Sequence, residues 1–171
     1  MRPRCWLYST ILLATCSPLV AQSGPIPSDA TDPMTFRTLF NRDLLLNDLA
    51  DEADTAGTAK PYLRKQLANR FSLSDTDCAT LHRLAVQYKS ESDPLRARVN
   101  VVLQSLNSRF PNSVIPPGAD TSPPPELHQL QLQEDALTLR YRDLLHNAMR
   151  EADFQLLQTK ARATFGGVSS K

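Results

Sequence analysis

Helical spacing of apolar residues is the feature that most limits the folds open to this chain. Between residues 36 and 165, apolar side chains recur every three or four positions, as they do on one face of an α-helix. No segment of useful length alternates apolar and polar residues, which is the pattern of a half-buried strand. The sequence therefore predicts an all-α protein without a sheet.

Two helices are predicted in the first part of this pattern. Asp32 and Pro33 suit the N-cap and first position of a helix that Gly57 would end. Its apolar face consists of Phe36, Leu39, Phe40, Leu46, Ala50 and Ala53. Pro61 opens a shorter helix whose apolar residues are Tyr62, Leu63, Leu67 and Phe71.

The third predicted helix covers residues 75–110 and passes through a proline. Ser74 and Asp77 form an acidic version of the capping box at its start. Apolar residues before and after Pro94 keep the same helical phase, which two independent helices would match only by chance. We therefore expect one helix, bent at Pro94. Its apolar face consists of Cys78, Leu81, Leu84, Ala85, Tyr88, Leu95, Val99, Val102, Leu103, Leu106 and Phe110.

A Pro-rich loop over 111–125 precedes a last helix that is expected to run to Phe165, where Gly166 and Gly167 stop it. The main apolar face of this helix is Leu127, Leu130, Leu137, Tyr141, Leu144, Leu145, Ala148, Met149, Ala152 and Leu156. After Asp153 a second set appears on the opposite side, consisting of Phe154, Leu157, Ala161 and Phe165. Such a switch indicates a bend, or neighbours on both sides of the helix.

These segments predict a single helical domain over 32–165. Its main element is a long antiparallel helical hairpin, 75–110 against 125–153, with the N-terminal helices packed alongside. Residues 166–171 are expected to form a flexible tail.

The first 21 residues have the layout of a secretory signal peptide. Arg2 and Arg4 precede a short apolar run, Pro18 breaks it, and small residues near 21–24 offer a cleavage site. The run is too short for a membrane span, and residues 22–31 would form a flexible tether. In an alternative interpretation, the segment 13–16 is a lipoprotein box with a lipid anchor on Cys16; ordinary cleavage is preferred.

Loss of the signal peptide changes the balance of charge and cysteine. The whole chain has 19 basic and 18 acidic residues, and removal of Arg2 and Arg4 leaves a net charge near −1. No basic excess remains to attract nucleic acid or an anionic membrane. Cys78 is the one cysteine left, so an exported domain would have no internal disulfide.

The chemistry of the common enzyme motifs is missing from the sequence. Glycines fall at predicted helix ends or in loops, so neither a phosphate loop nor a nucleophile elbow is present. We predict no catalytic residues and no cofactor. Cys78 and His82 are four residues apart and could share a metal. Two ligands do not make a site, and a small buried cysteine beside a surface histidine is the favoured interpretation.

Other polar residues have simpler expected roles. His128 and His146 have no ligand partner at helical spacing and are predicted to be solvated. Glu134 and Asp43 fall on apolar faces, so each is expected to pair with an arginine such as Arg98 or Arg109.

Leu132 and Leu139 form a second apolar stripe, one heptad apart and outside the main face. The stripe either contacts the N-terminal helices or forms a surface for a protein partner or a homodimer. These two leucines are the partner-binding candidates.

Leu73-Ser74-x-x-Asp77 opens a long helix that a second long helix follows after a turn. Over residues 73–165 this layout resembles small exported helical-hairpin proteins of bacterial envelopes with Leu-Thr-x-x-Gln signatures, a group of periplasmic stress chaperones and metal-resistance sensors. Asp77 stands where that signature has Gln, and the His-rich ligands of the metal sensors are missing. The resemblance implies a non-enzymatic protein-binding role as chaperone or stress adaptor. A structural lipoprotein and a metal-binding sensor are the alternatives.

The exported form should begin between Gln22 and Pro25, because Pro18 and the small residues after it define the exit from the apolar run. Intact-mass measurement of exported material checks this. A diacylglycerol-modified chain beginning at Cys16 would establish the lipoprotein alternative instead.

Overall fold

Five helices make up a computed structural model of the chain, which describes residues 28–109 and 122–166. They are α1 (Ser28–Thr55), α2 (Tyr62–Phe71), α3 (Asp75–Arg109), α4 (Pro125–Ala148) and α5 (Glu151–Phe165). No strand occurs among these residues, so the all-α prediction is confirmed. The predicted signal peptide, residues 111–121 of the Pro-rich loop and the tail beyond Gly166 lie outside the described residues.

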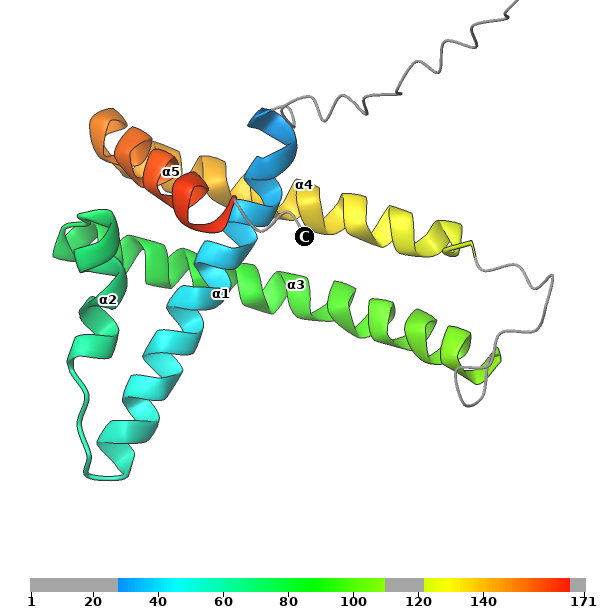
Figure 1. Cartoon of the computed structure of the whole chain (residues 1–171), viewed down its shortest axis with the longest axis horizontal. Helices are drawn as coiled ribbons and strands as arrows, with labels where there is room; N and C mark the ends of the chain where they lie inside the picture. The colour runs from blue at the N-terminus through cyan, green and yellow to red at the C-terminus, as the bar shows by residue number, and fades with distance from the viewer. Residues whose placement is uncertain (1–27, 110–121, 167–171) are drawn as a thin grey trace, which may run out of the picture.

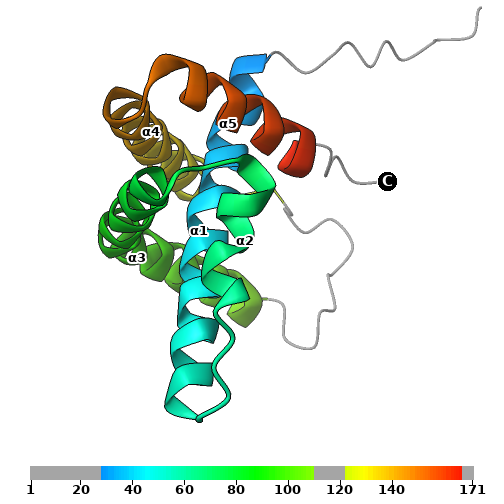
Figure 2. The same cartoon turned by 90° about the vertical axis from the view of Figure 1, so that its left-hand side faces the viewer.

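Helices α3 and α4 form the predicted antiparallel hairpin, and the contact between them is the most extensive between any two helices of the described structure. Helix α1 crosses both of them steeply, and α2 lies on the other side of α1 (Figures 1 and 2). Helix α5 packs against α1 and α2. In the described residues, no helix is long and apolar enough to cross a membrane.

The end of α1 agrees with the prediction, but its start does not. The helix begins at Ser28, so the predicted start at Asp32 is wrong and Pro33 lies inside the helix. Pro33 is the sixth residue of α1, so the helix lacks one i→i−4 hydrogen bond there, although the fixed φ of proline is itself helical. Gly57 ends the helix as predicted, with a φ of +70°. The N–H of Thr58 then donates to the carbonyl of Ala53 at 2.8 Å, as in a Schellman motif.

The predicted capping box of α3 is present. The N–H of Asp77 donates to Ser74 Oγ at 3.1 Å, and the N–H of Ser74 donates to Asp77 Oδ2 at 3.2 Å. Each side chain thus satisfies a backbone donor of the other residue. Helix α3 also continues without interruption through Pro94, which confirms the interpretation based on helical phase.

The last predicted helix is in fact two. Met149 and Arg150 adopt extended backbone between α4 and α5, so the prediction of one helix to Phe165 is wrong. The break explains the switch of apolar face, because α5 can turn Phe154, Leu157 and Ala161 inward, and all three are buried. Leu144 and Leu156, predicted on the core face, are exposed.

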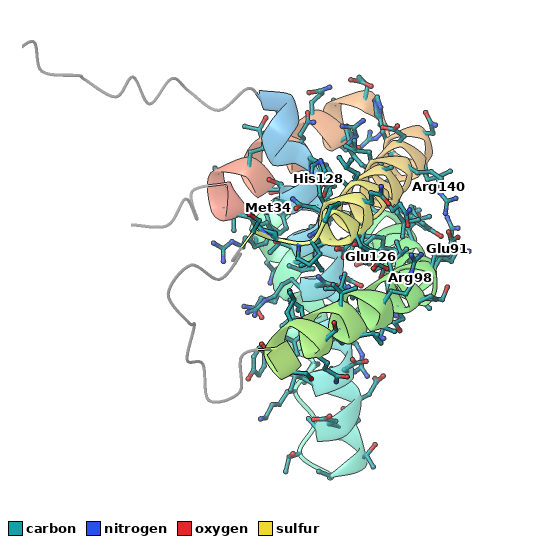
Figure 3. The ribbon with its side chains drawn as sticks, turned by 90° about the vertical axis from the view of Figure 1, so that its right-hand side faces the viewer. Met34, Glu91, Arg98, Glu126, His128 and Arg140 are labelled. Carbon is teal, nitrogen blue, oxygen red and sulfur yellow. The ribbon has the colours of Figure 1, made fainter. Side chains whose placement is uncertain are left out.

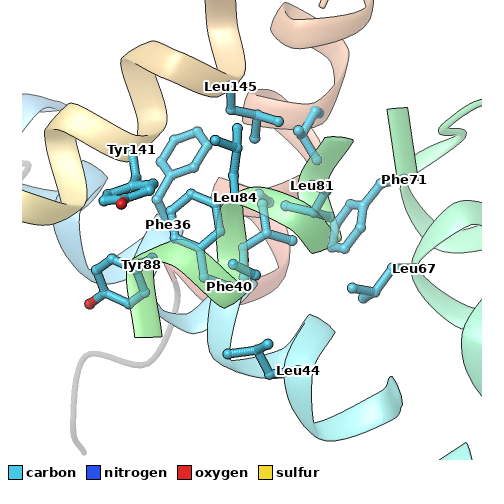
Figure 4. Close-up of a cluster of buried hydrophobic side chains, with 14 of the residues drawn as sticks. Phe36, Phe40, Leu44, Leu67, Phe71, Leu81, Leu84, Tyr88, Tyr141 and Leu145 are labelled. Carbon is cyan, nitrogen blue, oxygen red and sulfur yellow. The ribbon is translucent and has the colours of Figure 1, made fainter. Parts of the chain in front are cut away.

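The core is aromatic where α1 crosses the hairpin (Figure 4). The ring centroid of Phe40 lies 5.3 Å from that of Tyr88 and 6.4 Å from that of Tyr141. Phe36 stacks on Phe154 of α5 at 5.9 Å. The whole predicted apolar face of α1 is buried, as are the α3 residues Leu81, Leu84, Ala85 and Tyr88.

Replacing Pro94 with Ala should leave the free energy of unfolding unchanged or raise it by about 1 kcal/mol, since it restores a backbone donor inside a continuous helix. Ala97→Pro, at an exposed position of the same helix, is the matched control and should cost about 3 kcal/mol. Urea unfolding measures both. A large loss of stability in Pro94→Ala would show that the fold needs the proline itself.

Candidate functional site

The outer half of α3 keeps its apolar stripe but is not covered. The last buried residue of α3 is Ser92, and none of residues 93–108 is buried in the described structure. Leu95, Val99, Val102 and Leu106 continue the stripe and are only partly buried. Helix α1 crosses the hairpin closer to the start of α3, and Arg96 is the residue of this half that still hydrogen-bonds α1, through Asn41 (Figure 1). Helix α4 is the main neighbour of this half.

A groove lies between the end of α3 and the start of α4. It has a volume of about 450 Å³ and is lined mainly by Ala97, Val101, Val102, Leu106 and Pro124. We call it the outer groove. Val101 is 64% exposed. At the rim, Arg98 Nη2 lies 3.6 Å from Glu126 Oε1 and joins the two helices.

A second, smaller hollow, the inner groove, follows along the same pair of helices. It has a volume of about 390 Å³, and Leu95, Gln133 and Leu137 are among its lining residues. Arg140 and Glu91 pair across it, and the hydroxyl of Tyr141 donates to Glu91 Oε1 at 2.7 Å. Hydrogen bonds from Tyr141 and Arg140 lower the pKa of Glu91, so this carboxylate is ionised near neutral pH.

Both grooves lie on the side of the α3–α4 pair away from α1, which we call the open face. Helix α1 contacts the pair through other residues: Asp43 meets His82, and Arg37 meets Glu134. Figure 3 shows Glu91, Arg98, Glu126 and Arg140 together on the pair, with α1 on its far side. The open face therefore offers apolar surface between two pairs of charges.

Glu134 anchors the covered side of the hairpin. It lies 3.3 Å from Arg37 of α1 and 3.2 Å from Arg96 of α3, and Arg96 also donates to Asn41 at 3.2 Å. Glu134 was predicted to pair with an arginine, and it does, but its partners are Arg37 and Arg96 and not Arg98 or Arg109. Arg98 instead binds Glu126, and the side chain of Arg109 lies outside the described residues.

Asp43 pairs with a histidine, so its predicted pairing with arginine is wrong. It is buried on α1, and its Oδ2 lies 2.8 Å from His82 Nδ1 on α3. Burial raises the pKa of Asp43, and the hydrogen bond and charge of His82 oppose that rise. The two residues are far apart in sequence and meet because α1 crosses α3 at this point.

Cys78 lies one turn from His82 and is partly buried. Burial raises the pKa of its thiol, and the nearby carboxylates of Asp43, Asp75 and Asp77 raise it further. A thiol held protonated is a poor nucleophile and metal ligand. In the described part of the chain, no group of three or more His, Cys, Asp or Glu side chains is placed to hold a metal ion.

The remaining predicted residues lie elsewhere. His128 is exposed, as expected, but His146 is half-buried: its ring stacks on Phe154 at 4.3 Å and its Nε2 bonds Glu151. Leu132 is exposed and Leu139 partly buried on α4, and neither lines a groove. Val101, the most exposed large apolar residue of the outer groove, was missed because it falls off the predicted stripe.

No protein-family model, curated protein or solved structure matches this chain. The resemblance to exported helical-hairpin envelope proteins, stated on Leu73-Ser74-x-x-Asp77, stays a prediction.

Replacing His82 with Ala should lower the free energy of unfolding near neutral pH by about 1–3 kcal/mol, because ionised Asp43 loses its buried hydrogen bond. Asp43 binds its proton more tightly in the fold than in the unfolded chain. Its ionisation therefore costs stability as the pH rises through the folded pKa, and His82 offsets part of that cost. The loss in His82→Ala should shrink as the pH falls toward 3.8, the ordinary value for this carboxyl group.

Urea unfolding of the wild type and His82→Ala near neutral pH and in acid measures this effect. In the control, Asp43→Asn combined with His82→Ala should show no such pH dependence at this position. A loss in His82→Ala that is equally large at both pH values would contradict the assigned role of Asp43.

Proposed function

We propose that this protein is exported, is not an enzyme, and binds apolar segments of other polypeptides in the manner of an envelope chaperone or stress adaptor. The observation that carries the proposal is the open face of α3 and α4. There, an apolar stripe in phase with the core leaves the core and remains accessible along residues 93–108.

The chemistry of the outer groove supports binding of polypeptide. Its lining is apolar apart from Ser105 and the Arg98–Glu126 pair. A volume of about 450 Å³ has room for a few large side chains, and burying each one would contribute about 1.5–3 kcal/mol. Charged groups at the rim keep such a surface soluble and can hydrogen-bond the backbone of a bound segment.

Export rests on the N-terminal residues. Arg2 and Arg4, the short apolar run and the small residues near 21–24 favour a signal peptide, and a lipid anchor on Cys16 is the alternative form of the mature protein. A metal-sensing role has less support, because His82 is already bound by Asp43 and the thiol of Cys78 is held protonated.

The exported form should suppress the aggregation of an unfolding test protein, followed by light scattering. Val101→Gln should weaken this protection about tenfold, because burial of a valine at the site contributes on the order of 1.5 kcal/mol. Val101 is 64% exposed, so the substitution should leave helix content and melting temperature nearly unchanged.

Val86→Gln is the matched control, since Val86 is an exposed valine on the same helix and lies outside both grooves. It should protect as well as the wild type. Leu132→Gln tests the surface predicted from sequence. If that variant loses protection while Val101→Gln keeps it, partners bind to the Leu132 side of α4 and not to the groove. If neither the wild type nor any variant suppresses aggregation of the test protein, the chaperone proposal is wrong.

A further inference from the structure

The residues that line the two grooves include four charged side chains, and their signs alternate. Glu91 and Arg98 lie one heptad apart on α3, and Glu126 and Arg140 lie two heptads apart on α4. Residues separated by whole heptads share one face of a helix. All four therefore lie along the open face, as Figure 3 shows.

The antiparallel pairing of the helices turns these charges into a checkerboard. At one end of the face, Glu91 of α3 lies against Arg140 of α4. At the other end the signs are reversed, with Arg98 of α3 against Glu126 of α4. Each helix thus carries one charge of each sign, and each end of the face does too.

Such a pattern is complementary to itself. When a second copy is turned over about a two-fold axis lying in the face, every acidic position meets a basic position of the other copy. This holds whether α3 lies on the partner's α3 or on its α4. Two-fold contacts of this kind, in which both subunits use the same patch, are the commonest way in which a chain assembles with itself.

The same face supplies the apolar centre that a stable contact needs. Between and beside the charged pairs lie Ala97, Val101, Leu95 and Leu137, which are exposed or partly buried. Interfaces typically combine an apolar centre with a charged and polar rim. The net charge of these four residues is zero, so two copies approach without net repulsion.

We propose that the open face of α3 and α4 binds a second copy of this chain, face to face, through the checkerboard of Glu91, Arg98, Glu126 and Arg140. The inference rests on the proposed function, because it names the polypeptide that covers the outer groove when no client is bound. A client then competes with the second copy for the same surface.

Two complementary variants test the pairing. In the basic variant, Glu91→Arg and Glu126→Arg make all four charges positive. In the acidic variant, Arg98→Glu and Arg140→Glu make all four negative. The ion pairs within each chain are exposed and contribute little to stability. The basic variant also loses the acceptor of the Tyr141 hydroxyl and should melt at a somewhat lower temperature. Circular dichroism should show unchanged helix content in both variants.

Sedimentation equilibrium gives the assembly state of the exported form. The wild type should have twice the mass of a single chain, each variant alone should have the mass of one chain, and their equimolar mixture should recover the doubled mass. A wild type that stays at the mass of one chain would overturn the inference. The inference would also be overturned if either variant dimerised alone, or if the mixture of the two stayed monomeric.

The outcome can be separated from that of the proposed function. A monomeric wild type that protects a client through Val101 would leave the chaperone role standing without self-pairing. A dimer whose mixed variants restore the doubled mass, but which protects no client, would leave self-pairing standing without the chaperone role.

Discussion

The aromatic cluster at the crossing of α1 with α3 and α4 holds the rest of the structure together. Phe40 lies against Tyr88 and Tyr141, and the rings of those two tyrosines are 5.7 Å apart. Side chains of this size remove roughly 150–250 Å² each from water. Because α1 crosses the hairpin steeply, this burial is confined to a short length of each helix. The buried residues of α3 accordingly end at Ser92, and the apolar stripe beyond it is only partly covered.

Polar contacts beside the cluster define how α1 sits on the hairpin. Tyr88 donates its hydroxyl hydrogen to Thr138, whose own hydroxyl donates to the carbonyl of Glu134. The carboxylate of Glu134 then binds Arg37 of α1 and Arg96 of α3. Glu134 is largely shielded from water, so losing these partners would cost free energy, and slipping α1 along the hairpin is unfavourable. The partly covered apolar stripe of residues 93–108 follows from this constraint, since α1 cannot slide along the hairpin to cover it.

Most local signals in the sequence predicted the helices correctly, although the start signal at Asp32 and Pro33 did not. The face that begins with Phe36 and Phe40 is buried as predicted, and the stop at Gly57 and the cap at Ser74 are where they were expected. The break after Ala148 was missed because neither Met149 nor Arg150 disfavours a helix strongly. It was visible only indirectly, in the change of apolar face after Asp153, and a single bent helix explained that change equally well.

What the sequence by itself determined is the set of helices and their apolar faces, because both depend on spacing within a few turns of one segment. Helical phase alone was enough to predict that α3 continues through Pro94 as one helix. The tertiary structure alone decided which apolar positions are covered and which charges meet. Val102 and Tyr88 belong to the same stripe, yet one borders a groove and the other is buried. Asp43 bonds His82 and not an arginine. Both outcomes depend on where α1 crosses the hairpin, and that is set by contacts between residues far apart in the chain.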